Sequence, residues 1–307
     1  LRGRVIRCVG EPVTRFCEDG LRILRAVRFA ATLEFAIAPD TANAVRDCRA
    51  LLDNIARERV RIEWDKLLLG AGAVPVLRAF PEIVGQIFPE VTPCFGFAQN
   101  SRYHCFDVWE HTLAALEYAK ADHIVRLALF FHDIGKPAVY REDACGGHFP
   151  GHAKVSVELA QAAMERLRYD RDTTARVLAL VREHDMPLPT QEKGVRRLMM
   201  RFDDADIARL LEIQRCDRLA HHPDFRDLPQ EWYALPATVE KLRAEHACLS
   251  LRDLAVNGRD LMALGIPAGR EVGRILQELL DAVVDGNLEN EKKTLLAEAE
   301  IRKKEKV

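Results

Sequence analysis

Apolar residues recur at helical spacing through most of this 307-residue chain. Leu21, Leu24 and Val27 lie three residues apart and are followed by Phe29, so they form one stripe of a helix. A second set of this kind is Ile55, Val60, Ile62, Leu67 and Leu68. Strand-like alternation is nearly absent, and Gly and Pro signals divide the pattern at short intervals. The sequence therefore predicts an all-α fold.

The chain is long enough, at 48% hydrophobic residues, to bury more than one core. We expect three regions: an Arg-rich helical region over 1–95, a His-rich helical region over 96–224, and a helical tail over 225–307. The first boundary rests on the polar loop 93–101. The second rests on the His-His-Pro-Asp sequence at 221–224.

The net charge of −2 gives no overall field for nucleic acid. The basic residues are concentrated at the N-terminal side, where residues 1–70 hold 13 Lys and Arg against 10 Asp and Glu. The eight cysteines show no CxxC spacing, and no apolar run reaches the length of a membrane helix. These features predict a cytoplasmic protein with reduced thiols and no membrane partner.

Six of the ten histidines lie between His104 and His152. Within this segment an apolar run ends in His132 and Asp133, and one residue later a Gly-Lys-Pro sequence predicts the end of the helix. Burying both polar groups without partners would be costly, and a divalent cation would satisfy both. Taken alone, the dipeptide is better explained as a helix-terminal histidine beside a solvated aspartate.

The surrounding sequence favours the metal interpretation. His111 lies on a predicted helix with an apolar opposite face, and Asp217 lies in a similar pattern downstream. The resulting order H…HD…D resembles the HD superfamily of metal-dependent phosphohydrolases. The resemblance implies a helical bundle with a metal held between its helices. It also implies that His111, His132, Asp133 and Asp217 are catalytic.

Four further residues extend this interpretation, each with an open alternative. In two-metal HD proteins the pattern lengthens by two histidines, and His152 and His184 stand in the matching order, although each alone fits a capping or surface role. The resemblance implies one or two divalent ions, with Mg, Mn, Ni, Fe and Zn not distinguished. His104 is a candidate phosphate contact or a loop residue. Lys136 is a candidate phosphate contact or a cation at a helix end.

A second motif lies near the N-terminus, where Glu18 and Asp19 precede arginines at 22, 25 and 28. One interpretation is a solvated helix with ion pairs. The other is that a fixed Asp accepts and a fixed Arg donates hydrogen bonds to the edge of a nucleotide base.

This stretch resembles the EDxxRxxRAxRFA motif of bacterial class II tRNA nucleotidyltransferases, the CCA-adding and poly(A) polymerase family. The resemblance implies that Asp19 and Arg22 select the incoming CTP or ATP, and that the chain binds tRNA. The segments 57–67 and 257–290 are similar to later parts of the same family, so the resemblance covers nearly the whole chain. The residues that it implies for RNA binding are Arg25, Arg28, Arg57 and Arg59.

The chain departs from the family pattern at its start. No Gly-Gly phosphate loop and no DxD pair precede Arg15, and the sequence begins with Leu1 rather than Met. The pattern predicts that the catalytic head domain is missing from this chain, and that the chain alone does not add nucleotides, because two-metal phosphoryl transfer needs those carboxylates.

Three functions remain open at this point. The first is an HD-type metal-dependent phosphohydrolase, acting on phosphomonoesters or cyclic phosphates, joined to a tRNA-binding neck and body in tRNA 3′-end maturation or repair. The second is a non-hydrolytic tRNA- and nucleotide-binding part of a CCA-adding enzyme. In the third, the metal only stabilises the fold. We expect tRNA and nucleotides as partners, and a homo-oligomer is left open.

Overall fold

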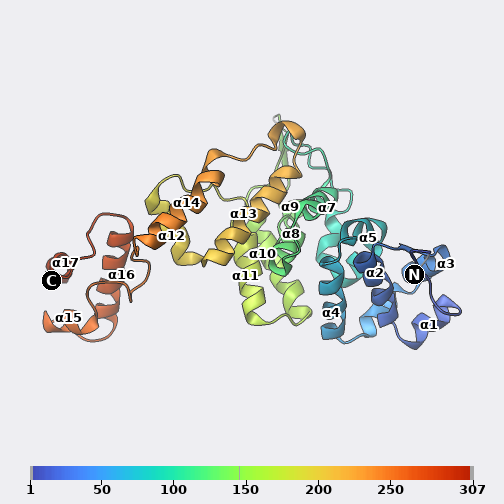
Figure 1. Ribbon diagram of the computed structural model, residues 1–307, viewed down its shortest axis with the longest axis horizontal. Coiled ribbons are helices and arrows are strands. Elements are labelled where there is room, and N and C mark those ends of the chain that lie inside the picture. Colours follow the sequence, from blue (N-terminus) through green and yellow to red (C-terminus); the bar gives the residue numbers. More distant parts are fainter. Residues whose placement is uncertain (1–2, 145, 305–307) are drawn as a thin grey trace. The chain divides into compact units, whose positions relative to one another are not determined.

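The computed structural model describes residues 3–144 and 146–304. It is helical almost throughout, which confirms the expectation of a mainly helical chain (Figure 1). The first helices are α1 (Pro12–Glu18), α2 (Leu21–Leu33), α3 (Pro39–Asp47), α4 (Arg57–Leu68), α5 (Ala73–Ala79) and α6 (Pro81–Ile87). The next are α7 (Val108–Tyr118), α8 (His123–Phe131), α9 (Lys136–Val139), α10 (His152–Arg166) and α11 (Arg171–Glu183). The last are α12 (Glu192–Arg201), α13 (Asp204–Leu219), α14 (Gln230–Ala244), α15 (Gly258–Ala263), α16 (Arg270–Val284) and α17 (Lys292–Lys304).

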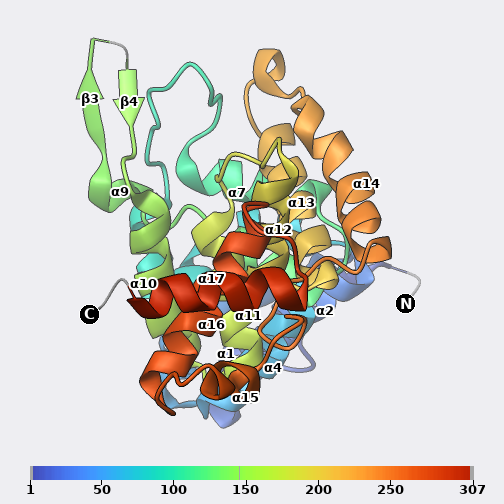
Figure 2. The same ribbon diagram turned by 90° about the vertical axis from the view of Figure 1, so that its left-hand side faces the viewer.

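Three short 3-10 helices and four short strands complete the described elements. The 3-10 helices are η1 (Arg49–Asn54), η2 (Pro89–Cys94) and η3 (Pro223–Phe225). β1 (Val5–Ile6) pairs in parallel with β2 (Ala36–Ile37). β3 (Arg141–Asp143) and β4 (Gly146–His148) form an antiparallel hairpin (Figure 2). Gly146 and Gly147, which the sequence pattern predicts only as a turn between helices, lie in β4 of this hairpin.

The chain forms two compact units. Unit 1 contains residues 1–186 and 209–228, and unit 2 contains residues 187–208 and 229–307. The Arg-rich and His-rich regions expected from the sequence thus fall largely within one unit, while residues 187–208 belong with the tail. The assignment of separate roles to the three regions stays a prediction.

An aromatic cluster joins α4 to α8 in unit 1. The rings of Trp64, Phe88 and Phe130 meet edge to face, with centroid separations of 4.7, 4.8 and 4.9 Å. All three side chains are fully buried. Edge-to-face packing places the positive edge of one ring on the negative face of the next, which fixes the orientation of the rings. The Arg-rich helices and the His-rich helices therefore share one core.

Aspartates begin three helices of unit 1. The side chains of Asp107, Asp122 and Asp170 accept the backbone N–H groups of Glu110, Val125 and Thr173 at the starts of α7, α8 and α11. A carboxylate at this position satisfies an otherwise free N–H group and complements the positive end of the helix. These caps fix where the histidine-bearing helices start.

Unit 2 has its own core, formed by residues of α15, α16 and α17 and the segment before them. Its fully buried members include Leu261, Ile275, Leu279 and Leu295. Within the described part of the chain, no helix has both the length and the apolar character that a membrane crossing requires. The described cysteines are free thiols.

Candidate metal centre and nucleic-acid interface

Six histidine and aspartate side chains meet in unit 1 between α7, α8, α10, α11 and α13. We call this group the His–Asp centre; it consists of the residues predicted as metal ligands, His111, His132, Asp133, His152, His184 and Asp217. They form two sets of potential ligands, and within each set the ligand atoms lie within 4.8 Å of one another. One set is His111, His132, Asp133 and Asp217; the other is Asp133, His152 and His184. The structure therefore brings together all six residues.

Asp133 is the residue that both sets share. Its Oδ2 lies 3.2 Å from Nε2 of His132 and 3.5 Å from Nε2 of His111. Its Oδ1 lies 3.3 Å from Nε2 of His152 and 3.7 Å from Nε2 of His184. The side chain is only 1% exposed, and neither oxygen accepts a hydrogen bond of ordinary geometry. One carboxylate thus faces both groups of imidazoles, as a carboxylate that bridges two ions would.

Backbone carbonyls orient three of the histidines. Nδ1 of His132 lies 2.6 Å from the carbonyl of Leu129, and Nδ1 of His184 lies 2.8 Å from that of Val181. His152 makes the same contact three residues back in the chain, at 3.0 Å. An Nδ1–H that donates to a carbonyl leaves Nε2 as the acceptor nitrogen directed at the centre. This is the arrangement that metal-binding histidines commonly have.

The histidine pair of the second set also suits a cation. Nε2 of His152 and Nε2 of His184 lie 3.2 Å apart. When both Nδ1 atoms carry a proton, the two Nε2 atoms are acceptors that face each other without a donor between them. A divalent cation would satisfy both lone pairs and the Asp133 oxygen together.

The charges of the centre are strongly coupled. Burial alone would raise the pKa of Asp133, but the charges of His132 and Lys136 outweigh it and hold this pKa well below its usual value. Burial alone would lower the pKa of His132, whereas the Asp133 carboxylate raises it to about 10. Burial and the charge of His132 lower the pKa of His184 to about 4. A cation that enters the centre would therefore displace a proton from His132 and meet a neutral His184.

Lys136 supplies the countercharge in the protein itself. Its ammonium lies 2.6 Å from Oδ2 of Asp133 and donates to Oε1 of Gln99 at 2.8 Å. The side chain is buried. The interpretation of Lys136 as a cation at a helix end does not fit, because its ammonium points into the His–Asp centre. Gln99 was used in the sequence analysis only as a loop signal.

A cavity of about 740 Å³ reaches the His–Asp centre. Asp133, His152, His184 and Asp217 lie at its wall, together with Lys136 and His104. The loop residues Arg102 and Tyr103 and the hairpin residue His148 line it as well. An ion at the centre would have one side toward this cavity.

Gly135 allows α10 to approach the centre. A Cβ atom at this position would lie 2.5 Å from the carbonyl oxygen of His152 and 2.6 Å from the backbone nitrogen of Ser156. Instead, the N–H of Gly135 donates to Oγ of Ser156 at 2.9 Å. The Gly of the Gly-Lys-Pro sequence is therefore needed for the contact that brings His152 to Asp133, and its role as a helix stop is secondary.

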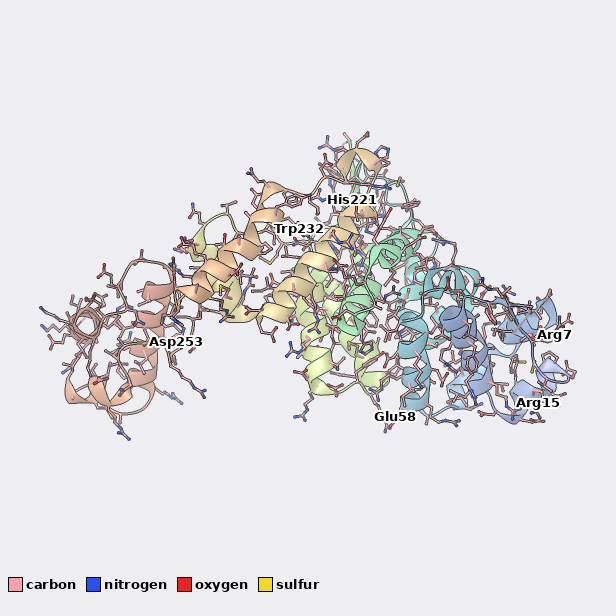
Figure 3. The ribbon with its side chains drawn as sticks, viewed as in Figure 1. Arg7, Arg15, Glu58, His221, Trp232 and Asp253 are labelled. Carbon is pink, nitrogen blue, oxygen red and sulfur yellow. The ribbon has the colours of Figure 1, made fainter. Side chains whose placement is uncertain are left out.

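His221 is a neighbour of the centre that the sequence analysis used only as a domain boundary. It follows α13, four residues after Asp217 (Figure 3). Its Nε2 lies 3.7 Å from Oδ1 of Asp217, and burial lowers its pKa to about 4. Residues four apart share a helix face, so the spacing from Asp217 was a signal present in the sequence.

The arginine motif lies on α1 and α2, and the two helices are separated at Asp19 and Gly20. The sequence predicts that Glu18 and Asp19 begin the helix that carries the arginines; instead Glu18 ends α1 and Asp19 lies between the two helices. Oδ1 of Asp19 accepts the N–H of Leu21. Nη1 of Arg22 donates to Glu18 at 2.6 Å and to the carbonyl of Arg15 at 2.9 Å. Within the described residues, Nε and Nη2 of Arg22 have no acceptor.

The four arginines predicted to bind RNA have different surroundings. Arg28 is the most enclosed: its Nε lies 2.6 Å from Glu63, its side chain is 15% exposed, and its guanidinium lies over the ring of Phe29. Arg59 is exposed and lies 3.7 Å from Asp19. Arg25 is exposed and Arg57 is half-buried, and neither forms an ion pair with a described residue. Arg25 therefore offers a free charge, whereas the charge of Arg28 is neutralised within the protein.

Two family models match parts of the chain. The model described as "tRNA nucleotidyltransferase domain 2 putative" matches residues 151–299. The model described as "Probable RNA and SrmB- binding site of polymerase A" matches residues 34–94. The second match covers α3 to α6, which follow the arginine motif directly.

The fold is that of a CCA-adding enzyme over the length of this chain. The solved CCA-adding enzyme of Bacillus stearothermophilus in complex with CTP superposes with a TM-score of 0.67 at 27% identity, over 99% of this chain and 67% of that one. The CC-adding tRNA nucleotidyltransferase of Thermus thermophilus is 36% identical over 94% of this chain and 67% of its own length. The A-adding tRNA nucleotidyltransferase of Deinococcus radiodurans is 33% identical over 92% of this chain and 68% of its own length. The chain belongs to the tRNA nucleotidyltransferase and poly(A) polymerase family.

The prediction that the chain is an HD-superfamily phosphohydrolase is wrong. The relatives that match nearly its whole length are nucleotidyltransferases, and the two matching family models carry no hydrolase description. The physical reason for the error is that imidazole and carboxylate ligands define where an ion can bind, and the same ligands serve structural and catalytic ions.

Replacing Gly135 with Ala should disturb the His–Asp centre from the backbone. Because a Cβ atom would overlap the backbone of α10, we expect the helix to move and the free energy of unfolding to fall by about 1–3 kcal/mol. Binding of Zn²⁺ should weaken as His152 leaves Asp133. Urea unfolding and a Zn²⁺ titration measure the two effects. The control is Gly273→Ala on α16, where a Cβ atom meets nothing within 4 Å and stability should be unchanged or slightly increased. A free energy of unfolding and a Zn²⁺ affinity at the wild-type values in Gly135→Ala would contradict the close approach of Gly135 to the backbone of α10.

Proposed function

We propose that this chain is the part of a tRNA nucleotidyltransferase that binds tRNA and reads the incoming nucleotide during maturation or repair of the tRNA 3′ end. The observation that carries the proposal is the match, at 36% and 33% identity over more than nine-tenths of the chain, to a CC-adding and an A-adding enzyme. The chain spans about two thirds of the length of these relatives. Transfer of CMP or AMP by the chain itself is therefore a separate question from binding.

Nucleotide reading is assigned to Asp19 and Arg22. The carboxylate of Asp19 accepts hydrogen bonds, and Arg22 keeps Nε and Nη2 free to donate them. Cytosine and adenine each present an amino donor beside a ring-nitrogen acceptor on the pairing edge, so one acceptor and one donor suit both bases. Uracil and guanine present a carbonyl and a ring N–H at the corresponding positions, which reverses the pattern and leaves both side chains unpaired.

The test of this assignment is the base preference of nucleotide binding, measured by calorimetry on the complete chain. Wild type should bind CTP and ATP more tightly than UTP and GTP. Asp19→Asn and Arg22→Gln should reduce that preference by about tenfold, since a lost hydrogen-bond pair costs on the order of 1–2 kcal/mol. Asp40→Asn, an exposed acid on α3, is the matched control. Equal binding of the four nucleotides by wild type would refute the role of the pair.

Contact with tRNA phosphates is assigned to Arg25, Arg57 and Arg59, with a different role for Arg28. The buried ion pair with Glu63 uses the charge of Arg28, so this residue holds α2 against α4. Arg25 lies on the same helix, is exposed, and has no such partner. Substitutions at these two positions can therefore distinguish an effect on RNA binding, expected at Arg25, from an effect on the stability of the fold, expected at Arg28.

Arg25→Ala should weaken binding of tRNA lacking its 3′ CCA by about three- to tenfold and reduce the salt dependence by roughly one charge, because one phosphate contact is lost. Its free energy of unfolding should stay at the wild-type value. Arg28→Ala should instead lower the free energy of unfolding by about 1–3 kcal/mol, because the Glu63 side chain, which is only 12% exposed, is left without its partner. Filter binding at several salt concentrations and urea unfolding measure the two effects. The reverse outcome would contradict this division of roles.

The His–Asp centre is assigned a divalent cation that stabilises unit 1. The ligands fit such an ion because Asp133 directs one oxygen toward each pair of imidazoles, and because the acceptor nitrogens of His152 and His184 face each other. Imidazole and carboxylate together suit Zn²⁺, Ni²⁺, Fe²⁺ or Mn²⁺. The ion would neutralise the buried carboxylates Asp133 and Asp217 and hold the ends of α8 and α11 together.

Removal of the ion by a chelator should lower the thermal midpoint of wild type. An ion present at one hundred times its dissociation constant contributes about 2.7 kcal/mol, which corresponds to a shift of several degrees. Asp133→Asn should remove the sensitivity to chelator, because this residue belongs to both ligand sets. The control variant, Asp143→Asn on the exposed hairpin, should keep the wild-type sensitivity of its thermal midpoint to chelator. An identical midpoint with and without chelator, for a protein whose metal content falls to zero, would sink the stabilising role.

A further inference from the structure

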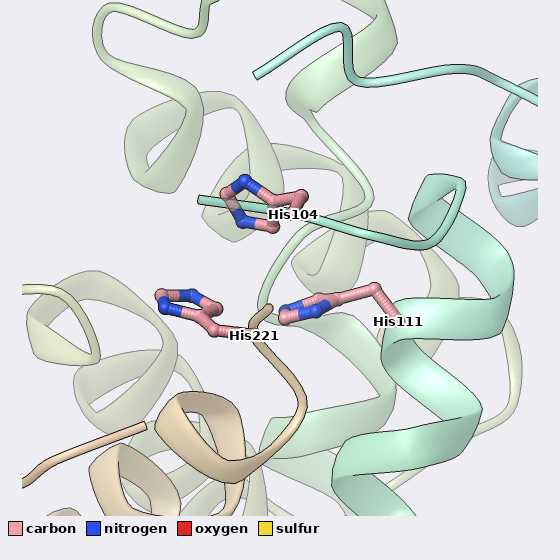
Figure 4. A group of neighbouring side chains, drawn as sticks. All are labelled: His104, His111 and His221. Carbon is pink, nitrogen blue, oxygen red and sulfur yellow. The ribbon is translucent and has the colours of Figure 1, made fainter. Parts of the chain in front are cut away.

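Three histidine rings gather on the side of the His–Asp centre that faces the loop before α7. His104 comes from that loop, His111 from the first turns of α7, and His221 from the residues after α13 (Figure 4). The ring centroid of His104 lies 5.1 Å from that of His111 and 4.7 Å from that of His221. One nitrogen of each ring lies within 4.8 Å of one nitrogen of the other two. We call these residues the histidine triad.

Each ring of the histidine triad has a nitrogen without a partner. Nδ1 of His104, of His111 and of His221 is buried and makes no hydrogen bond with the described residues. Buried polar atoms in folded proteins nearly always have a partner, so three such atoms in one cluster require an explanation. In this they differ from His132, His152 and His184, whose Nδ1 atoms each face a carbonyl.

The histidine triad has room for an ion after a small adjustment. Three imidazole nitrogens around one transition ion lie about 2.0–2.1 Å from it and hence about 3.3–3.5 Å apart. The ligand nitrogens, which lie within 4.8 Å of one another, must therefore approach by up to roughly 1.5 Å. His104 lies outside the helices, so rotation of its side chain does not disturb a helix.

Nearby charges act in both directions. The ammonium of Lys136 lies 3.4 Å from Nε2 of His104 and opposes a cation. The Asp217 carboxylate lies 3.7 Å from Nε2 of His221 and favours one. Lys136 is already 2.6 Å from Asp133, which offsets its charge. Because these charges largely offset each other, binding of a cation here would depend mainly on its affinity for imidazole nitrogen.

We propose that His104, His111 and His221 form a second transition-metal position, distinct from the ligand sets that contain Asp133. A set of three imidazoles selects borderline ions such as Zn²⁺, Ni²⁺, Cu²⁺ or Co²⁺ over Mg²⁺ and Ca²⁺. His111 belongs both to this group and to the set with Asp133; because a neutral imidazole has one N–H and one acceptor nitrogen, it can hold an ion in only one of the two positions at a time. Because His104 lines the cavity of about 740 Å³, an ion with three protein ligands has its fourth position on the cavity side.

The experiment is a Zn²⁺ titration of the complete metal-stripped chain in competition with a chromophoric chelator. His104→Asn and His221→Asn should each bind one ion fewer than wild type. The double variant should bind no fewer ions than either single variant, since both residues hold the same ion. His222→Asn is the matched control, because His222 neighbours His221 in the chain but has a side chain that is 43% exposed and lies outside the cluster. Mg²⁺ binding should be the same in all variants.

A second measurement separates ligand loss from misfolding. With Cu²⁺ added at less than one ion per chain to an Asp133→Asn background, which lacks the residue common to the other two ligand sets, the nitrogen hyperfine pattern should indicate three ligands, and His104→Asn should reduce it to two. Circular dichroism of the metal-free variants checks that they are folded. If His221→Asn does not fold, the Zn²⁺ and Cu²⁺ measurements on His104→Asn are sufficient to test the metal position. Unchanged Zn²⁺ stoichiometry and affinity in His104→Asn would overturn the histidine triad as a metal position.

Discussion

The buried carboxylate of Asp133 is the constraint around which unit 1 is organised. A charge that is 1% exposed must be compensated nearby, and each neighbouring element supplies part of the compensation. Lys136 comes from α9 and His152 from α10. His132, next in the chain, takes up a proton because of this charge. The arrangement of these helix ends is thus an electrostatic requirement as much as a packing one.

The same unit contains the arginine motif, and a shared core links the two. Trp64 on α4 packs against Phe130 on α8, two residues before His132. Arg126, on the same helix, is buried and donates to the carbonyls of Leu68 and Ala119, at the ends of the chain segments α4 and α7. The arginine motif and the His–Asp centre consequently lie in one unit and are linked through a shared core, although they are formed by different helices and the function proposed for each is different.

Much of this could be predicted from the sequence, because helical periodicity and ligand order are local properties. The pattern H…HD…H…H…D identified six residues that the structure brings together. What it could not supply was the set of contacts between distant segments: the role of Gly135 depends on Ser156, and the contact of Lys136 depends on Gln99. The hairpin was missed because three-residue strands are too short to show alternation. The reaction class was predicted wrongly, because ligand identity does not determine chemistry, and the comparisons with nucleotidyltransferases corrected it.

The contact between Gly135 and Ser156 has a consequence for how such a chain can change over time. Any side chain at 135 meets the backbone of α10, and backbone cannot be substituted away. The hydroxyl of Ser156 in turn satisfies a buried N–H that would otherwise have no acceptor. Tolerance to substitution is therefore a joint property of the two positions. During evolution Gly135 could be replaced only if the segment that leads into α10 also changed its length or position. Substitutions at 135 and 156 should therefore be rare and should occur together.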